Sequence, residues 1–204
     1  MANNTPKVYL PNLNGLRFIA AFMVIIHHLE QIKSSFGLPN SYEWTIVSGV
    51  LGVTLFFSLS GFLITYLLLI EKESIITISI KDFYARRILR IWPLYYVIIF
   101  LALFILHRQP FFELSPEYTQ LVDSQFSLAL ILYIFFLPNI VLGGLEIVVP
   151  YASQAWSIGV EEQFYLIWPL LMKWSKNIGK AILIIIILYL GIKLCFIPII
   201  KNFI

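Results

Sequence analysis

Residues 14–30 read NGLRFIAAFMVIIHHLE, an apolar run with Arg17 near one end and two adjacent histidines, His27 and His28, near the other. With its flanking residues the run reaches about the 20 residues that an α-helix needs to cross the hydrocarbon core of a bilayer. Ionisable side chains are costly in that environment and mark functional sites by default. The segment therefore predicts both a membrane span and a functional face on it.

The composition supports the membrane as the solvent. Of 204 residues, 60% are hydrophobic and only 12% are charged, with a mean hydropathy of +0.88, whereas soluble domains contain about 25% charged residues. The net charge of +3 is small and lies in loops, which gives no support for a nucleic-acid partner. The single cysteine, Cys195, cannot form an internal disulfide, and no Cys/His spacing resembles a metal site. We therefore expect an integral membrane protein without a metal.

Six apolar segments are long enough to be considered as membrane spans. They cover residues 14–32, 46–70, 88–106, 125–143, 157–174 and 181–200. All are expected to be helices, because an open strand in lipid would leave backbone groups without hydrogen bonds. The sequence thus predicts an all-α, polytopic transmembrane bundle of about six membrane helices, forming a single domain over residues 1–204.

The loops around the third segment predict the orientation. Residues 71–90, EKESIITISIKDFYARRILR, are rich in Lys and Arg, whereas Arg108 in residues 107–124 is outnumbered by acidic residues. Excess Lys and Arg mark the cytoplasmic side, so the N-terminus is predicted to be cytoplasmic. The later lysines Lys173, Lys176 and Lys180 would then fall outside. Either they break the rule or one of the third to fifth segments does not fully cross, and 157–174 is the first suspect because it contains two glutamates and Pro169.

An arginine cluster lies in the stretch FYARRILRIWPLYY, residues 83–96. Arg87 and Arg90 are three positions apart and share a helix face, and Arg86 lies within a turn of Arg90. One interpretation is a positive anchor at the foot of a span. The other is a clamp for phosphate, since guanidinium groups bind phosphate oxygens in pairs. The residues alone leave both interpretations open.

Two adjacent acids interrupt the stretch QAWSIGVEEQFYLIWPLL, residues 154–171. Glu161 and Tyr165 are four positions apart and share a face, whereas Glu162 points elsewhere. Acids in so apolar a run predict a functional site. The alternative is that both lie at a membrane interface, with Trp156 and Trp168 as aromatic anchors.

Small residues occur together in the second segment, LFFSLSGFLITYLLL, residues 55–69. Ser58, Ser60 and Gly61 favour close packing of helices in a bilayer. A nucleophilic role for Ser60 is not favoured, because SLSGF lacks the strand-to-helix context of G-x-S-x-G hydrolases.

Helical geometry relates the polar residues of the first segment. From Arg17 to His28 a helix makes three turns plus about 20° and rises about 16 Å, so the two share one face. From Arg17 to His27 the rotation is about 80° short of three full turns, so His27 points to a different side of the helix. One face can therefore present an arginine at one end and an imidazole at the other. The alternative is that the histidines sit at one interface and Arg17 extends to the other.

Four motifs, in this order and at these separations, resemble those of the acyltransferase-3 family of integral membrane O-acyltransferases. They are LNGLRFIAAFMVIIHH at 13–28, FFSLSGFLIT at 56–65, FYARRILRIWPLYY at 83–96 and WSIGVEEQFYL at 156–166. The resemblance implies transfer of an acyl group, often acetyl, from acyl-CoA to a hydroxyl of an extracytoplasmic glycan such as O-antigen of lipopolysaccharide, exopolysaccharide or peptidoglycan. It also implies a location in the bacterial inner (cytoplasmic) membrane.

The resemblance also implies roles for individual residues. The family's arginine and histidine, separated by ten residues, fall on Arg17 and His28, and the acid of its W-S-x-x-x-E motif falls on Glu161. Its R-x-x-R pair falls on Arg87 and Arg90, which with Arg86 would hold the CoA phosphates. His28 would remove the proton of the acceptor hydroxyl, and Glu161 would orient or stabilise that imidazole. Direct transfer and an acyl-histidine intermediate both stay open.

Two other functions compete with the acyltransferase. A transporter or flippase could use the intramembrane Arg, His and Glu residues as a pathway, although that does not explain the arginine cluster. Family members usually continue through further spans, whereas this chain ends at Ile204. We therefore expect a domain that is incomplete at its C-terminus, which makes an inactive truncated fragment the remaining alternative.

Overall fold

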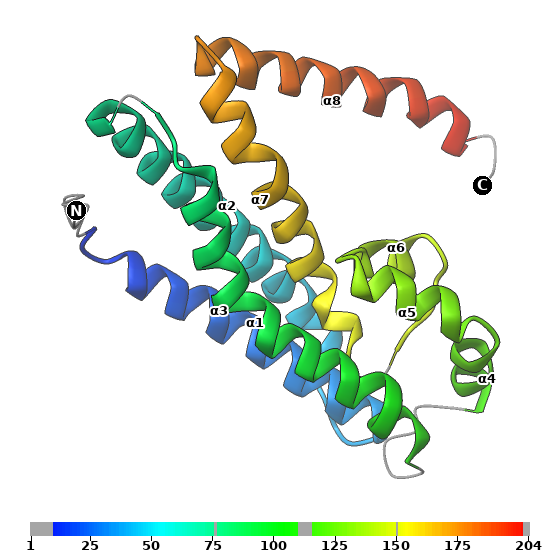
Figure 1. Cartoon of the computed structure of the whole chain (residues 1–204). Helices are drawn as coiled ribbons and strands as arrows, with labels where there is room; N and C mark the ends of the chain where they lie inside the picture. Colours follow the sequence, from blue (N-terminus) through cyan, green and yellow to red (C-terminus); the bar gives the residue numbers. More distant parts are fainter. Residues whose placement is uncertain (1–9, 76, 110–115, 150, 202–204) are drawn as a thin grey trace.

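The computed structural model describes residues 10–75, 77–109, 116–149 and 151–201, and every regular element in them is helical (Figure 1). The longer helices are α1 (Leu13–Ser35), α2 (Tyr42–Ile75), α3 (Ile80–Phe100), α7 (Trp156–Trp174) and α8 (Ile178–Lys201). The short helices are α4 (Pro116–Ser124), α5 (Phe126–Ile134) and α6 (Pro138–Gly143). A π-helical segment, Leu101–Ile105, extends α3, and 3₁₀ turns occupy Leu106–Arg108 and Ser153–Ala155. The predicted all-α class is confirmed.

Three helices in the described ranges are long and apolar enough to cross a membrane. They are Leu13–Ser34, Tyr42–Ser74 and Ile80–Ile105, with 22, 33 and 26 residues. They correspond to the first three predicted spans. The third helix begins earlier than the predicted residue 88, so the arginine cluster lies inside α3 and not in a loop. Its three arginines are therefore held at fixed helical spacing.

Helices α1 and α2 pack closely because two glycines of α2 face α1. A Cβ atom at Gly52 would lie 2.8 Å from the Ala20 carbonyl oxygen, and one at Gly49 would lie 2.6 Å from the His27 ring. Small residues let helix backbones approach in a bilayer. The sequence assigned this role to Ser58, Ser60 and Gly61. For Gly61 the prediction was wrong, because a Cβ there would meet no atom within 4 Å.

The predicted span 125–143 is not one helix. It forms α5 and α6, of nine and six residues, separated by a turn in which Phe136 has a φ of 57°. At 1.5 Å per residue these helices measure about 14 and 9 Å, far short of the roughly 30 Å hydrocarbon core. Pro138 begins α6, where its missing N–H costs no hydrogen bond. The chain therefore folds back on itself in this segment instead of crossing as a single span.

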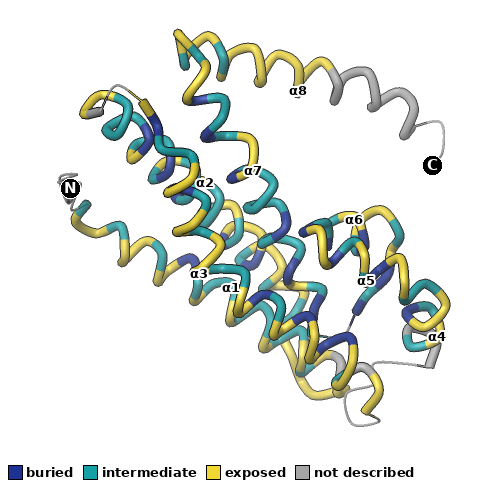
Figure 2. Tube along the Cα trace, viewed as in Figure 1, coloured by how far each residue is buried: buried dark blue, intermediate teal, exposed yellow. Residues whose placement is uncertain are grey.

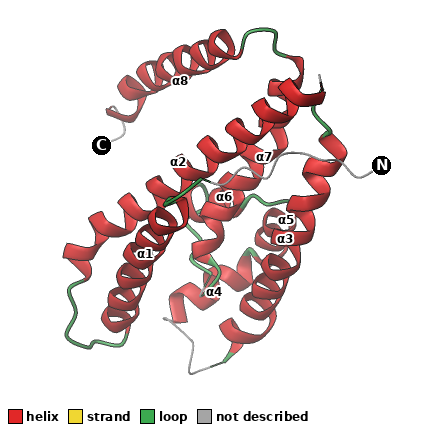
Figure 3. Cartoon of the chain, turned by 90° about the vertical axis from the view of Figure 1, so that its left-hand side faces the viewer, coloured by secondary structure: helices red, strands yellow, loops and turns green. Residues whose placement is uncertain are grey.

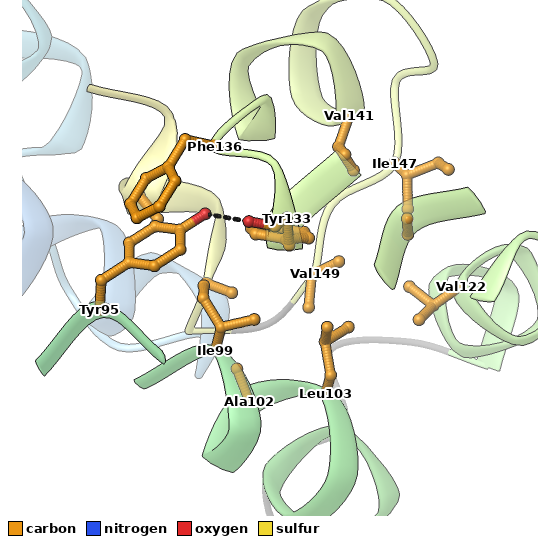
Figure 4. Packing of buried hydrophobic residues seen from close by; sticks show 13 residues of the cluster. Tyr95, Ile99, Ala102, Leu103, Val122, Tyr133, Phe136, Val141, Ile147 and Val149 are labelled. Carbon is orange, nitrogen blue, oxygen red and sulfur yellow. Dashed lines mark hydrogen bonds between the residues drawn. The ribbon is translucent and has the colours of Figure 1, made fainter. Parts of the chain in front are cut away.

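Side chains from α3 and α7 satisfy the carbonyl groups that this turn exposes. The Tyr95 hydroxyl donates to the Tyr133 carbonyl at 2.8 Å (Figure 4). The Tyr96 hydroxyl donates to the carbonyl of Ile134 at 3.0 Å. The Gln163 Nε2 donates to the carbonyl of Phe136 at 3.0 Å. Non-helical backbone at membrane depth is tolerated only when protein or water satisfies it, so these bonds fix the turn against α3 and α7.

A buried apolar cluster surrounds the turn and joins it to α3. Tyr95 stacks on Phe136 with ring centroids 4.3 Å apart, and both belong to the cluster drawn in Figure 4. The other labelled members are Ile99, Ala102, Leu103, Val122, Tyr133, Val141, Ile147 and Val149. Of the helices that carry predicted site residues, α3 contributes Tyr95 and Ile99 to this cluster, and Ile158 of α7 packs against it.

Helix α7 lies beside the C-terminal half of α2 and runs in the same direction (Figures 1 and 3). The Trp156 ring contacts Phe57 with centroids 6.1 Å apart, and the Trp168 Nε1 donates to Thr65 Oγ1 at 2.8 Å. At the far end, Lys72 Nζ donates to the carbonyls of Met172 and Ser175 at 2.7 and 2.9 Å. The two helices therefore end together.

This arrangement resolves the charge conflict that the sequence raised. Because Lys72 meets the end of α7, the lysines Lys173, Lys176 and Lys180 lie at the same end of the bundle as the basic stretch 71–90. The suspected segment 157–174 lies in a continuous helix of 19 residues, α7, although α7 is not among the three helices long and apolar enough to cross a membrane. The interrupted segment is 125–143.

The last predicted segment, 181–200, is helical and lies within α8. Figure 1 shows α8 extending away from the other helices. Its apolar residues from Leu183 to Leu190 are exposed, and Figure 2 colours this part of the helix accordingly. Such a surface is stable only against lipid or other apolar helices, which agrees with a membrane protein.

Candidate active site

A cavity of about 390 Å³ lies between α1, α2, α3 and α7. Its polar lining comes from all four helices and consists of Arg17, Ser60, Arg87, Arg90, Ser157, Glu161 and Tyr165. Val24, Val53 and Phe56 are among the residues that form its apolar walls. A concave, mostly apolar site with a few convergent polar groups is typical of a small-molecule site.

Four of the six predicted site residues meet in this cavity: Arg17, Arg87, Arg90 and Glu161. They come from three helices that are far apart in the sequence. Three guanidinium groups face a single carboxylate, so the cavity lining carries excess positive charge. Arg17 and Arg87 are half-buried and Arg90 is exposed. Partly buried positive charge that lacks a partner favours an anionic ligand.

Arg87 is the most enclosed of the three clustered arginines. Its guanidinium carbon lies 5.1 Å from the ring centroid of Tyr165 and 5.7 Å from that of Phe83. Stacking over aromatic rings attracts a guanidinium without neutralising it. The full charge of Arg87 therefore stays available to a ligand.

A second cavity, of about 370 Å³, adjoins the same arginines. Arg86, Arg87 and Arg90 line it together with Glu71 and the apolar residues Ile64, Leu67, Leu68 and Phe83. Arg86 thus reaches the second cavity and not the first. Arg87 and Arg90 line both, so the R-x-x-R pair stands where the two cavities meet.

The two adjacent glutamates have different partners, as the helical spacing predicts. Glu161 accepts a hydrogen bond from the hydroxyl of Tyr165. Glu162 points away from the cavity and accepts one from Trp92 Nε1 at 3.1 Å. The interfacial alternative for this helix has Trp156 and Trp168 as anchors at the membrane surface. In the structure their side chains contact Phe57 and Thr65 of α2.

The structure does not bring the histidines into the cavity. The Nδ1 atom of His28 lies 3.1 Å from Oε1 of Gln31, within hydrogen-bonding distance. His27 packs against α2, where its ring stacks on Tyr42 with centroids 5.3 Å apart. The cavity does reach Val24, which lies one helical turn before His28. No contact between His28 and Glu161 is seen among the described residues.

Sequence reasoning missed the residues that support the site. Tyr165 was noted only for sharing a face with Glu161, and Trp92 and Gln163 were not considered. A signal existed for Trp92, because a buried indole N–H needs an acceptor and the sequence offers few acids. Within the described ranges, no three His, Cys, Asp or Glu side chains converge as metal ligands would.

Comparison with known proteins then establishes the class. A family model described as an acyltransferase domain matches residues 10–204. The chain belongs to this family, the acyltransferase-3 family, which confirms the resemblance carried by the four motifs.

Two bacterial relatives show how the chain compares with curated members. It is 32% identical over 194 residues to the peptidoglycan O-acetyltransferase OatA of Listeria monocytogenes, covering 91% of this chain and 28% of that protein. It is 30% identical over 195 residues to the O-acetyltransferase OatA of Staphylococcus aureus, covering 91% of this chain and 29% of that protein. The chain thus spans under a third of the length of these relatives. No solved structure matches it.

Proposed function

We propose that this protein is a membrane O-acyltransferase that transfers an acetyl group from acyl-CoA to a hydroxyl of an extracytoplasmic glycan. The observation that carries the proposal is the cavity in which Arg17, Arg87, Arg90 and Glu161 converge. Family membership supports the reaction class. Peptidoglycan is the first acceptor to test, because the Listeria relative is named for that substrate.

The arginines support a CoA donor. CoA carries a 3′-phosphate and a pyrophosphate, and guanidinium groups bind phosphate oxygens with strong, paired hydrogen bonds. Arg86, Arg87 and Arg90 line the cavity nearer the basic end of α3 and would hold these phosphates. The pantetheine arm would then extend into the first cavity toward Arg17 and Glu161.

The transfer step needs a base, and we keep His28 in that role. The acceptor oxygen attacks the thioester carbonyl, the C–S bond breaks, and CoA leaves as a thiol after taking up a proton. Neutral imidazole suits removal of the hydroxyl proton because its pKa lies near neutrality. Val24 of the cavity wall lies one turn from His28 on α1, so an acceptor entering from that end would pass the imidazole.

The charges support an orientation for this reaction. Both basic stretches lie at one end of the bundle, and excess Lys and Arg favours the cytoplasmic side. The donor site would therefore open to the cytoplasm, with the N-terminus also cytoplasmic and His28 toward the outer face of the inner membrane. That arrangement brings a cytoplasmic acyl donor to an external acceptor.

Labelled acetyl-CoA tests the proposal. Membranes that contain the chain should transfer label to peptidoglycan or to another glycan of a panel, and Arg87→Ala or Arg90→Ala should weaken CoA binding by about 1.5 to 3 kcal/mol. Lys81→Ala is the matched control, because Lys81 is an exposed cation on the first turn of α3 that lines neither cavity.

Three results would contradict the proposal or part of it. Unchanged CoA affinity in both arginine variants would mean that the cluster only anchors the helix. Movement of glycan across the membrane without label transfer would indicate a transporter. Neither activity would indicate an inactive scaffold.

A further inference from the structure

Tyr165 lies where the acid and the arginine of the site meet, although no motif assigns it a role. Its side chain is 4% exposed and packs in the apolar cluster that joins α2, α3 and α7. It also lines the first cavity. Its hydroxyl donates to Glu161, and its ring lies under the guanidinium of Arg87.

The two contacts use different parts of the side chain. The hydroxyl gives Glu161 a charge-assisted hydrogen bond that fixes the direction of the carboxylate. The ring face attracts the guanidinium of Arg87, whose carbon lies 5.1 Å from the centroid. Phe83 holds Tyr165 in place, with ring centroids 6.3 Å apart and planes at 81°.

Tyr165 contacts both charged groups, Arg87 and Glu161, which within the described ranges form no ion pair with each other. A direct pair would neutralise both groups and leave neither free for a substrate. A neutral phenol that contacts both orients the carboxylate and the guanidinium while each keeps its charge.

We propose that Tyr165 is a positioning residue of the acyl-transfer site, with its hydroxyl orienting Glu161 for turnover and its ring orienting Arg87 for donor binding. The inference rests on the proposed function. It assigns the two parts of one side chain to two separable steps, so two substitutions distinguish them.

Tyr165→Phe removes the hydroxyl and keeps the ring. Turnover, measured as kcat for acetyl transfer, should fall about tenfold or more, as expected for loss of a hydrogen bond to a charged group. The affinity for acetyl-CoA should stay within about twofold, because the contact with Arg87 is retained. Tyr165→Leu removes both contacts, so acetyl-CoA affinity should also fall about tenfold.

The double variant tests whether the hydroxyl acts through Glu161. In a Glu161→Gln background the carboxylate is already lost, so adding Tyr165→Phe should lower kcat by less than about twofold further. Tyr84→Phe is the matched control. The Tyr84 hydroxyl also bridges α3 and α7, donating to the Leu166 carbonyl at 2.7 Å, but Tyr84 lines neither cavity. Its kcat and acetyl-CoA affinity should equal those of the wild type.

The outcomes separate this inference from the proposed function. Absence of acetyl transfer by the wild-type chain would refute the function, while CoA binding by Tyr165→Phe and Tyr165→Leu would still test the role of the ring. Three results would overturn the inference: a normal kcat in Tyr165→Phe, equal CoA affinity in Tyr165→Phe and Tyr165→Leu, or a full additional loss from Tyr165→Phe in the Glu161→Gln background.

Discussion

Arg17, His27 and His28 of α1 have three different surroundings. Arg17 is half-buried and lines the cavity, where an anionic ligand would balance its charge. The ring of His27 packs against Gly49 of α2. His28 lies beside Gln31 on the same helix. The apolar helix tolerates them because each has a polar, aromatic or cavity environment instead of lipid.

Replacing the histidines one at a time tests the base. His28→Ala should abolish acyl transfer and leave the protein in the membrane, because the proposed base is lost while the packing of α1 on α2 is kept. His27→Ala should retain substantial activity at reduced thermal stability, since its ring packs on Gly49 and Tyr42. Transfer assays on both variants, with membrane content as the control, decide the assignment. If His27→Ala is the inactive variant, or neither is, His28 is not the base.

The adjacent glutamates allow a matched comparison of two acids on one helix. Glu161→Gln should cut turnover strongly, because it removes the negative charge from the cavity. Glu162→Gln should have a smaller effect, since an amide oxygen can still accept the hydrogen bond from Trp92. Steady-state kinetics on both variants provide the test. Small and equal effects would show that neither carboxylate takes part in transfer.

Among the elements, the α5–α6 turn is the most unusual, because it places irregular backbone among membrane helices. Its stability depends on donors from α3 and α7, chiefly the hydroxyls of Tyr95 and Tyr96 and the amide of Gln163. Each of these bonds satisfies a carbonyl that no helix satisfies. The turn should therefore be sensitive to loss of single hydroxyl groups far away in the sequence.

Two tyrosines of this cluster should respond to the same change with opposite signs. Tyr95→Phe should lower the free energy of unfolding by about 0.5 to 1.5 kcal/mol, because the buried carbonyl of Tyr133 then keeps only the backbone N–H of Phe136 as a donor. Tyr133→Phe should be neutral or stabilising, because the Tyr133 hydroxyl is buried and finds no hydrogen-bond partner in the described part of the chain. Denaturant unfolding in detergent would measure both. An equal loss in the two variants would refute this account of the turn.

For the whole molecule, the helix directions follow from the contacts at the end of α2. Lys72 binds the last carbonyls of α7, so α2 and α7 end on one side, where α3 begins. The loop between α1 and α2 lies at the opposite end of these helices. All the basic stretches then lie together, as the excess of Lys and Arg on one side requires.

Cysteine labelling tests this topology in a Cys195→Ser background. Single cysteines at Asn40, Lys81 and Lys176 probe the α1–α2 loop, the start of α3 and the α7–α8 loop. A membrane-impermeant maleimide should label Asn40→Cys in intact cells, and the other two only after permeabilisation, if the basic ends face the cytoplasm as proposed. Labelling of Lys81→Cys and Lys176→Cys from opposite sides would contradict the paired ends of α2 and α7.

The sequence by itself determined the class, the all-helical fold and the spacing within each motif. Lipid offers a long apolar segment no structure other than a helix, so composition and length are sufficient for the three long spans. Within a helix, local spacing fixes which residues share a face. It therefore correctly predicted that Glu161 and Tyr165 share a face and that Glu162 points elsewhere.

Only the tertiary structure decided where those faces meet. The α5–α6 segment is as apolar as a true span, and what bends it is a set of donors, Tyr95, Tyr96 and Gln163, that lie 27 to 38 positions away along the chain. Likewise, the cavity depends on how α1, α2, α3 and α7 pack, and this packing left His28 outside while placing Tyr165 between an acid and an arginine. Hydrogen bonds and ring contacts between distant segments carry no periodic signal in the sequence, because they depend on the relative positions of whole helices.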